Sequence, residues 1–256
     1  MATESTIDLN SDLGEGFGHW TLGDDDALLG LVTSANVACG FHAGDASIMR
    51  SVCDLAADYD VAIGAHVGYR DLAGFGRRFI DVEPEILTQD VIYQIGALEG
   101  FASVAGSRVR YVKPHGALYN AIVRNEEQAA AVVRALVDYD PTLPVMGLAG
   151  SAWLRRAGEA GLTVVREAFA DRAYTPDGCL VSRRLPGAVL QDADEIASRC
   201  VAMARGEPIT DSGGGSLTLA ADSICVHGDT TRAVDIARKV KVALTAAGVG
   251  LAPFAV

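Results

Sequence analysis

Short apolar runs alternate with stretches of helical periodicity along the whole chain. Seven such runs predict strands: Ile7–Leu9, Ala35–Cys39, Val61–Ala65, Val109–Val112, Pro144–Ala149, Thr163–Arg166 and Ser223–Val226. Between the runs, apolar side chains recur at the spacing of a helix face, in the sets Ile48, Val52, Leu55 and Tyr59; Leu87, Val91, Ile95, Leu98 and Ala102; and Ala233, Ala237, Val240 and Leu244. This alternation predicts a parallel sheet with helical connections, either closed into a (β/α) barrel or open and doubly wound.

Two segments interrupt the alternation. Tyr174–Leu190 carries turn signals at Pro176 to Gly178 and at Pro186-Gly187, which predict a β-hairpin over one mouth of the domain. Asp211–Ser216 contains three consecutive glycines and is expected to be a flexible connection to the last strand. Neither segment has the character of a domain linker, so a single domain over residues 1–256 is expected.

Composition and charge narrow the function classes. The chain has 256 residues, 50% of them hydrophobic, and its 21 Lys+Arg against 33 Asp+Glu give a net charge of −12. These proportions exclude a disordered chain and argue against nucleic acid or an anionic membrane as partner. The N-terminal residues lack the features of a signal peptide, and no apolar run approaches the roughly 18 residues of a membrane span, so a cytoplasmic protein is expected.

The five cysteines give no sign of a shared chemical role. They are scattered and contain no Cys-x-x-Cys pair: Cys39, Cys53, Cys179, Cys200 and Cys225. Neither a disulfide framework nor a cysteine zinc site is therefore predicted. We expect all five to be buried as small apolar side chains.

Ionisable side chains gather where the expected strands end. Asp8, Asn10 and Asp12 alternate through the first strand and its exit. Four of the five histidines follow predicted strands, namely His42, His66, His115 and His227, and Glu15, Glu167, Asp171 and Arg172 would join them. The carboxyl ends of parallel strands share one face, so this face is the expected active site. Each histidine taken alone is equally well explained as a hydrogen-bonded structural residue, but the set favours a site.

Several charged residues have two interpretations. Lys113 directly follows an apolar strand, where it would bind a phosphoryl or carboxylate group or form a salt bridge to one of the acids. Arg77 and Arg78 lie in a glycine-containing loop that suits anion binding, a partner surface or plain solvation. Asp45 and Asp229 stand just before helical patterns, where a carboxylate accepts backbone N–H bonds. The chain has no Gly-x-Ser-x-Gly or His-Glu-x-x-His motif, which disfavours a serine hydrolase or a zincin.

At these residues the chain resembles the LamB/YcsF family nearly from end to end. The segments that carry the resemblance are Asp8–Glu15, Ala38–Asp45, Gly74–Arg78, Val112–Asn120, Phe169–Tyr174 and Cys225–Thr230. The resemblance implies a distorted (β/α)7–8 TIM-like barrel of the glycoside hydrolase/deacetylase type. It thereby favours the barrel over the open sheet, between which periodicity alone does not distinguish.

The resemblance also implies a reaction. It implies that this chain is one component of an ATP-dependent cyclic amide hydrolase. Together with 5-oxoprolinase subunits B and C, that component would open 5-oxo-L-proline to L-glutamate. ATP and Mg²⁺ are the cofactors that this implies. A five-membered lactam is an unreactive amide, and phosphorylation of its carbonyl oxygen makes the carbon electrophilic before water attacks. We expect this chain to contribute the phosphoryl activation.

On that resemblance, residue roles can be expected. The catalytic set is Asp12, His42, His66, Lys113, His115 and His227, and the substrate- or ATP-binding set is Asn10, Glu15, Asp45, Arg77, Glu167, Asp171, Arg172 and Asp229. Lys113 would steady the transferring phosphoryl group, and Asp12 and Glu15 would hold Mg²⁺ or orient the lactam. The histidines would supply hydrogen bonds or proton transfer, two of them oriented by Asp45 and Asp229.

Two other functions remain open from the sequence. The first is a metal-dependent deacetylase-like hydrolase, because Asp12, His42 and His66 imitate the Asp-His-His zinc set of related barrels, although the usual His-x-x-x-His pair is missing. The second is a non-catalytic, carbohydrate-binding or transport-linked protein, as the family name suggests. Sugar recognition usually uses aromatic platforms, and only 6% of this chain is aromatic.

Overall fold

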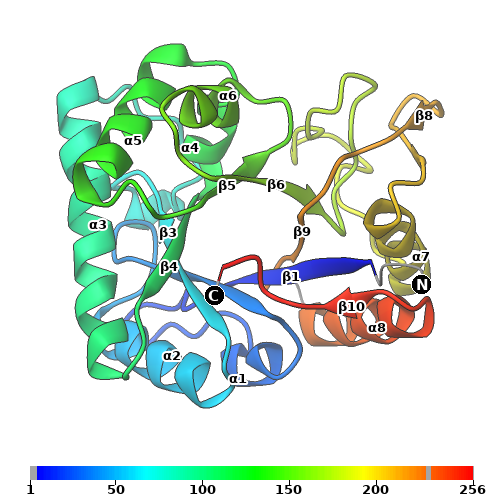
Figure 1. The fold of residues 1–256 in the computed structure, drawn as a ribbon, viewed down its shortest axis with the longest axis horizontal. Coiled ribbons are helices and arrows are strands. Elements are labelled where there is room, and N and C mark those ends of the chain that lie inside the picture. The colour runs from blue at the N-terminus through cyan, green and yellow to red at the C-terminus, as the bar shows by residue number, and fades with distance from the viewer. Residues whose placement is uncertain (1–4, 229–231, 256) are drawn as a thin grey trace.

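Seven parallel strands close into a barrel in the computed structural model of the chain, which describes residues 5–228 and 232–255 (Figure 1). The strands are β1 (Thr6–Leu13), β2 (Ser34–Ala38), β3 (Ala62–Val67), β4 (Val109–Pro114), β5 (Val145–Leu148), β6 (Val164–Phe169) and β9 (Ser223–Val226). They pair in that order, and β9 returns to pair with β1. The seven expected strands are confirmed, and the barrel is closed.

Closure depends on β1, which pairs with three strands along its length. The short strand β10 (Gly250–Leu251) pairs with its first residues, β9 with residues 8–11 and β2 with residues 10–13. The stagger between β9 and β2 leaves the carboxyl end of β1 beside β2, so Asp12 lies directly opposite Asn36. Polar residues of two strands are thereby brought to the same level of the barrel.

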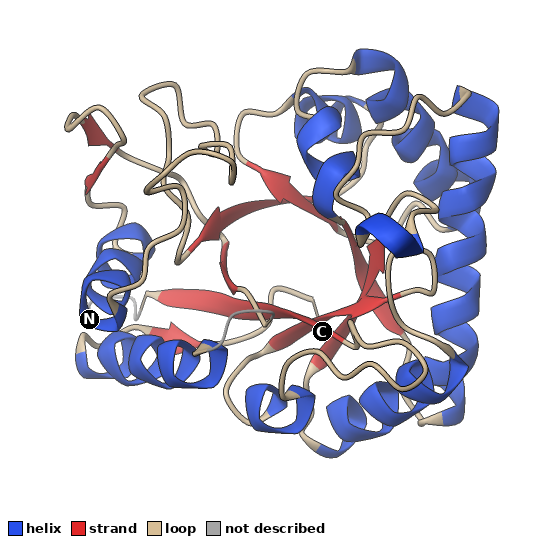
Figure 2. Cartoon of the chain, turned by 180° about the vertical axis from the view of Figure 1, so that it is seen from behind, coloured by secondary structure: helices blue, strands red, loops and turns tan. Residues whose placement is uncertain are grey.

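Helices pack around most of the barrel, and loops cover one side of it (Figure 2). The helices are α1 (Asp25–Leu29), α2 (Ala46–Asp58), α3 (Pro84–Val104), α4 (Gly116–Ala121), α5 (Glu126–Tyr139), α6 (Ala152–Glu159), α7 (Ala193–Ala204) and α8 (Ala233–Ala246), with a 3-10 turn, η1 (Leu72–Gly74). The three periodic segments of the sequence correspond to α2, α3 and α8. In α3 and α8 every residue of the expected apolar stripe is buried. Tyr59 differs, since it lies just past the end of α2 and is 47% exposed.

Four strands, β1, β3, β4 and β6, extend beyond the apolar runs that predicted them. The added residues include Asp12, His66, Lys113 and Glu167, all of which are buried. A polar residue ends an apolar run in the sequence, but these side chains find partners on other strands inside the barrel. His66 and Lys113 therefore lie within strands, whereas they were expected just after them.

The two interrupting segments also differ from expectation. The connection at residues 211–216 was expected to be flexible, but β7 (Ile209–Thr210) and β8 (Ser216–Leu217) pair as an antiparallel hairpin. The carboxylate of Asp211 closes its turn by accepting the backbone N–H groups of Gly213 and Gly215. The expected hairpin at Tyr174–Leu190 is reduced to two isolated bridges within a long loop before α7.

The cysteines are all free, as expected, and four of them are buried. Cys179 is an exception to the expected burial, because it is only half-buried, in the loop after β6. Among the described helices, none combines the length and apolar character that crossing a membrane requires.

Candidate active site at the carboxyl ends of the strands

A buried carboxylate forms the first polar layer inside the barrel. Asp8 of β1 accepts hydrogen bonds of 2.6 Å from the hydroxyls of Thr33 and Ser34, and one from Ser223. Burial raises the pKa of Asp8 to about 6, and the three hydroxyl donors only partly offset that effect. Asp8 therefore belongs to the interior network and is separate from the residues that line the pocket described below.

Lys113 of β4 is buried in the next layer and forms two ion pairs. Its Nζ atom lies 2.8 Å from Oδ1 of Asp12 and 2.7 Å from Oε1 of Glu167. Burial acts to lower the pKa of Lys113, but the neighbouring carboxylates, Asp12 foremost, outweigh burial and hold it well above its ordinary value. Of the two interpretations of Lys113, the structure shows the salt bridge, and the same side chain also lines the pocket.

Asp12 connects several strands. Its Oδ1 atom accepts a hydrogen bond of 2.8 Å from Nδ2 of Asn36, and its Oδ2 atom lies 3.4 Å from Nε2 of His66. Burial would raise the pKa of Asp12, but interactions with His66 and Lys113 outweigh it and hold the pKa well below its ordinary value. Asn10 completes the layer, because its Oδ1 atom accepts from both Asn36 and Lys113.

Three of the histidines meet one carboxylate at the ends of β1 to β4. We call this set the triple-histidine cluster: Glu15, His42, His66 and His115, all buried. Oε1 of Glu15 lies 3.6 Å from Nε2 of His42, 4.0 Å from Nε2 of His66 and 3.4 Å from Nδ1 of His115. Burial, and then the neighbouring imidazoles, lower the pKa of His42 and of His115 well below the ordinary value. These two imidazoles are therefore neutral near pH 7.

A glycine loop packs directly against the cluster. The rings of His42 and His115 are stacked with their centroids 3.7 Å apart. A Cβ atom on Gly76 would lie 2.7 Å from Cβ of His42 and 2.8 Å from Cδ2 of His115, and φ of Gly76 is +61°. Only glycine fits both this contact and this backbone conformation. The Gly74–Arg78 segment thus holds the two rings in place.

The fourth histidine forms a separate pair. Nδ1 of His227, which follows β9, lies 2.7 Å from Oδ1 of Asp171. The ring of His227 stacks on Phe169 with centroids 5.3 Å apart. Burial would raise the pKa of Asp171, but interactions with His227 lower it overall. Asp171 therefore stays ionised and orients the Nδ1 side of the His227 ring, which lines the pocket described next.

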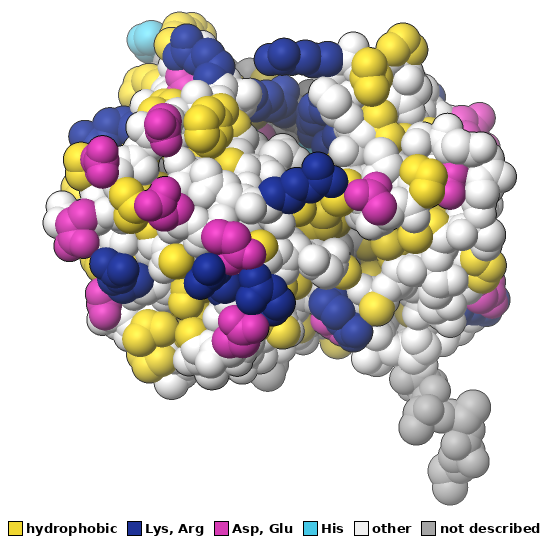
Figure 3. Space-filling model, turned by 90° about the horizontal axis from the view of Figure 1, so that it is seen from above, with side chains coloured by type: hydrophobic (Ala, Val, Ile, Leu, Met, Phe, Trp, Pro, Cys, Tyr) yellow, Lys and Arg dark blue, Asp and Glu magenta, His cyan; other side chains and the backbone are white. Residues whose placement is uncertain are grey.

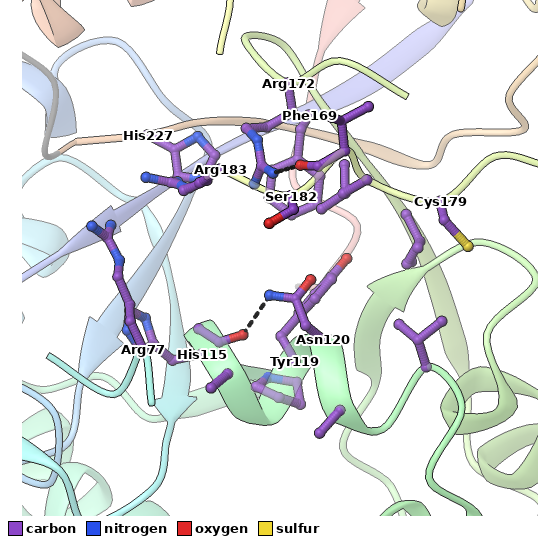
Figure 4. Close-up of a pocket in the computed structure, with 18 of the residues that line it drawn as sticks. Arg77, His115, Tyr119, Asn120, Phe169, Arg172, Cys179, Ser182, Arg183 and His227 are labelled. Atoms are coloured by element: carbon purple, nitrogen blue, oxygen red, sulfur yellow. Dashed lines mark hydrogen bonds between the residues drawn. The ribbon is translucent and has the colours of Figure 1, made fainter. Parts of the chain in front are cut away.

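A pocket of about 890 Å³ brings these groups together with several arginines. Its lining includes Asp12, Glu15, His66, Lys113, His115 and His227 from the barrel, and Arg77, Arg124, Arg172, Arg183 and Arg184 from the surrounding segments. Figure 4 shows Arg77, Arg172 and Arg183 around the same opening, with Tyr119 and Asn120 on another side. A space-filling view of one face shows Lys and Arg side chains around a recess (Figure 3). The pocket suits an anionic ligand.

Some expected site residues have other partners. The carboxylate of Asp45 accepts backbone N–H groups of Gly18, Ser47 and Ile48, and so caps α2 without orienting a histidine. Arg172 lines the pocket, but its guanidinium donates to the backbone carbonyls of Val181 and Ala188. Asp229 lies outside the described residues.

Other residues of the site were not predicted from the sequence. They are Asn36, which holds Asp12, and the lining residues Tyr119, Asn120, Arg124, Arg183 and Arg184. Asn36 offered a signal, since it is polar inside an apolar run. The sequence gives no comparable signal for the arginines, because the segments that carry them come to the pocket only when the chain folds.

The fold and site define a class of protein: a closed (β/α) barrel with an ionisable site at the carboxyl ends of its strands. The LamB/YcsF family profile matches residues 7–256, and the chain belongs to that family. It is 59% identical over 250 residues to the 5-oxoprolinase A subunit of Mycolicibacterium gilvum, covering 98% of this chain and 99% of that protein.

Solved structures extend the comparison. A "Lactam Utilization Protein" from Thermus thermophilus matches with a TM-score of 0.93 and 42% identity, over 97% of this chain and all of the other. A peptidoglycan N-acetylglucosamine deacetylase matches with a TM-score of 0.50 and 15% identity, over 99% of this chain and 88% of the other. That second likeness concerns the fold alone and agrees with a deacetylase-type barrel.

Proposed function

We propose that the chain acts in the ATP-dependent opening of 5-oxo-L-proline to L-glutamate, as one component of a complex with partner subunits B and C. The names of the relatives motivate the substrate and the division into subunits. The observation that carries the proposal is the pocket, where arginines lie beside Lys113 and His227, each of which is paired with a carboxylate. This gathering of positive charge stands out in a chain of net charge −12. A polyphosphate and a small carboxylated lactam are anions that suit such a pocket.

The chemistry divides between the two sides of the pocket. Transfer of the γ-phosphoryl group of ATP to the lactam carbonyl oxygen releases ADP and makes the carbonyl carbon open to attack by water. Arg77, Arg183 and Arg184 would bind the phosphates, and Lys113 would stabilise negative charge on the transferring group. Lys113 stays positioned for this because Asp12 and Glu167 hold its ammonium group.

Proton transfer is assigned to His227. Asp171 orients its Nδ1 atom, so Nε2 is the nitrogen that would take a proton from water or give one to the departing ring nitrogen. The lactam nitrogen needs that proton, because an amide anion is a very poor leaving group. Water adds to the phosphorylated carbonyl carbon, and the C–N bond breaks as the nitrogen takes up its proton, which leaves an acyl phosphate. A second water releases inorganic phosphate from it and gives L-glutamate, and these steps would be completed in the complex with the partner subunits.

Magnesium is proposed to enter with the nucleotide. Asp12 and Glu15 were expected to hold it, but Oδ1 of Asp12 is occupied by Lys113 and Asn36, and Glu15 faces three imidazoles. Mg²⁺ prefers oxygen ligands and water, so this donor set does not fit it. Phosphate oxygens of ATP are the natural ligands instead.

The test is glutamate release from 5-oxoproline with ATP and Mg²⁺. Three samples are compared: this chain alone, the cognate subunits B and C alone, and all three together, each also without ATP. The proposal expects glutamate, with matching ADP, only from the three together with ATP. Absence of glutamate from the folded mixture, or full activity without this chain, would refute it.

A further inference from the structure

The triple-histidine cluster contains a contact that neutral imidazoles do not explain. Nε2 of His66 and Nδ1 of His115 face each other at 3.0 Å. The other nitrogen of each ring faces a backbone carbonyl: Nδ1 of His66 lies 3.1 Å from the oxygen of Lys113, and Nε2 of His115 lies 2.9 Å from that of Phe75. A carbonyl oxygen only accepts, so both of these outer nitrogens carry the ring proton.

When both rings are neutral, each of the two facing nitrogens presents a lone pair. Two lone pairs at 3.0 Å repel each other, so a cation must lie between or beside them, either a proton or a metal ion. Histidines that bind a metal typically donate their other ring N–H to a backbone carbonyl or carboxylate, which fixes the ring and its tautomer. His66 and His115 both have this arrangement.

The remaining two members complete a ligand set. Within residues 5–228 and 232–255, neither nitrogen of His42 has a hydrogen-bond partner, although the side chain is 0% exposed. Its Nε2 atom faces Oε1 of Glu15 at 3.6 Å, which is too long for a hydrogen bond. A fully buried imidazole with an unused nitrogen is costly unless it binds something.

We propose that the triple-histidine cluster binds one divalent transition-metal ion that prefers imidazole, with Zn²⁺ the best match. The measured separations between ligand atoms run from 3.0 to 4.0 Å. Four ligands at the usual zinc distances of about 2.0–2.2 Å in a tetrahedron lie roughly 3.3–3.5 Å apart, and all four ligand atoms already lie within 4.8 Å of one another. Binding requires the His42 ring to turn out of its parallel stack on His115, so that both lone pairs point at the ion. Three imidazoles and one carboxylate favour Zn²⁺ over Mg²⁺ or Ca²⁺.

The charge of the site supports a cation. Glu15 is the one carboxylate of the cluster, a ligand type that attracts a cation, and neither nitrogen of His42 has a hydrogen-bond partner among the described residues that would compete with coordination. The cluster also borders the pocket, since Glu15, His66 and His115 line it. A metal here would therefore be reachable by a small ligand. The inference concerns binding alone and does not rest on the proposed function.

The test measures binding directly on the full chain. Purified protein is stripped with a chelator and titrated with Zn²⁺ by calorimetry, and with Co²⁺ by visible absorption. The same measurements are made on His42→Asn, His115→Asn and Glu15→Gln. The matched control is His19→Asn, which alters an exposed histidine outside the cluster. Circular dichroism confirms that each variant is folded.

The expected result is one Zn²⁺ per chain, with an intense tetrahedral Co²⁺ spectrum. Loss of one imidazole should weaken binding by at least about a hundredfold, or ~2.7 kcal/mol, while His19→Asn binds as the unaltered chain does. If the folded chain takes up neither metal, the proposal is overturned. That result is expected if a proton shared by His66 and His115 explains their contact. Equal binding by the cluster variants would also overturn the proposal.

Folding of the variants does not limit the test. The unaltered chain loaded with Zn²⁺ can be crystallised, and anomalous scattering at the zinc edge locates the ion. The proposal requires a peak between Glu15 and the three imidazoles. A peak at another place, with none in the cluster, would contradict it.

Discussion

At the scale of single residues, Lys113 neutralises two buried carboxylates at once. Replacement by Met keeps the volume but leaves Asp12 and Glu167 buried without their cation. We expect Lys113→Met to lose about 3–5 kcal/mol in the free energy of unfolding and, where still folded, most glutamate production in the complex. Urea unfolding and the glutamate assay measure the two effects.

The matched control for Lys113 is Lys239→Met. Lys239 forms an ion pair with Asp194 of similar length, 2.6 Å, but the side chains are 44% and 83% exposed. Water screens this pair, so its loss should change stability far less. Similar losses for the two variants, or near-normal turnover by Lys113→Met, would contradict the role assigned to the buried lysine.

Asp8 predicts a dependence of stability on pH. Burial raises its pKa in the folded chain from 3.8 to about 6, so the folded state binds the proton more tightly than the unfolded state. This contribution to stability is complete below pH 3.8 and is lost as the pH rises through 6. Relative to Asp8→Asn, the unaltered chain should lose about 2 kcal/mol between roughly pH 4.5 and 7.5.

Urea unfolding at several pH values tests the Asp8 prediction. The amide of Asp8→Asn does not titrate, so the difference between the two proteins isolates this carboxyl group. Parallel stability curves across that pH range would show that Asp8 has an ordinary pKa in the folded chain.

Single residues were predictable where they end an apolar run, and less so within one. Lys113, His115 and His227 stand out in the sequence because a charge or imidazole follows a strand-like segment. The role of Asn36 depends on the register that places it opposite Asp12. The grouping of His42 with His115 depends on how the loops after β2 and β4 fold back, which no local pattern specifies.

At the scale of elements, Asp45 begins α2 and ties it to a neighbouring loop. Oδ1 accepts the N–H groups of Ser47 and Ile48, and Oδ2 accepts that of Gly18. Asp45→Ala removes all three bonds and should lower the free energy of unfolding by about 1–2 kcal/mol. Asp45→Asn keeps one oxygen acceptor and should lose less.

Thermal and urea unfolding of these two variants measure the contribution of the cap. Metal binding by the triple-histidine cluster should be unaffected, because Asp45 contacts backbone groups and not the imidazoles. A loss of metal binding in folded Asp45→Asn would instead restore the expectation that Asp45 orients a histidine.

The barrel strands were predictable in number and order, and less so in length. Periodicity identifies the seven barrel strands and the helices α2, α3 and α8, because each buries a regular apolar face, but it did not identify α5, which has 14 residues like α8. It ends β3 and β6 too early, because His66 and Glu167 are polar yet buried by partners on other strands. It misjudges residues 211–216, because glycines that suggest flexibility also permit the turn that Asp211 closes.

At the scale of the whole molecule, local positive charge opposes a negative total. The chain carries −12, yet five arginines and Lys113 line one pocket. If the pocket binds ATP, attraction by these arginines must overcome repulsion from the rest of the surface. Both effects are screened by salt, but the close contacts are screened least.

We therefore expect Arg183→Ala to weaken binding of a non-hydrolysable ATP analogue by about tenfold or more, the loss of one charge-assisted hydrogen bond. The control is Arg238→Ala, an exposed arginine of α8 that pairs with Asp235 and is not among the residues lining the pocket. It should leave affinity almost unchanged, since removing a distant charge acts only through the screened field of the surface.

Calorimetry with the assembled complex at low salt and at about 300 mM KCl, where the Debye length is only several Å, measures the affinities of both variants. Equal affinities for the two variants at low salt would place the nucleotide elsewhere in the complex, whereas a selective loss for Arg183→Ala that persists at high salt would indicate direct phosphate contact in this pocket.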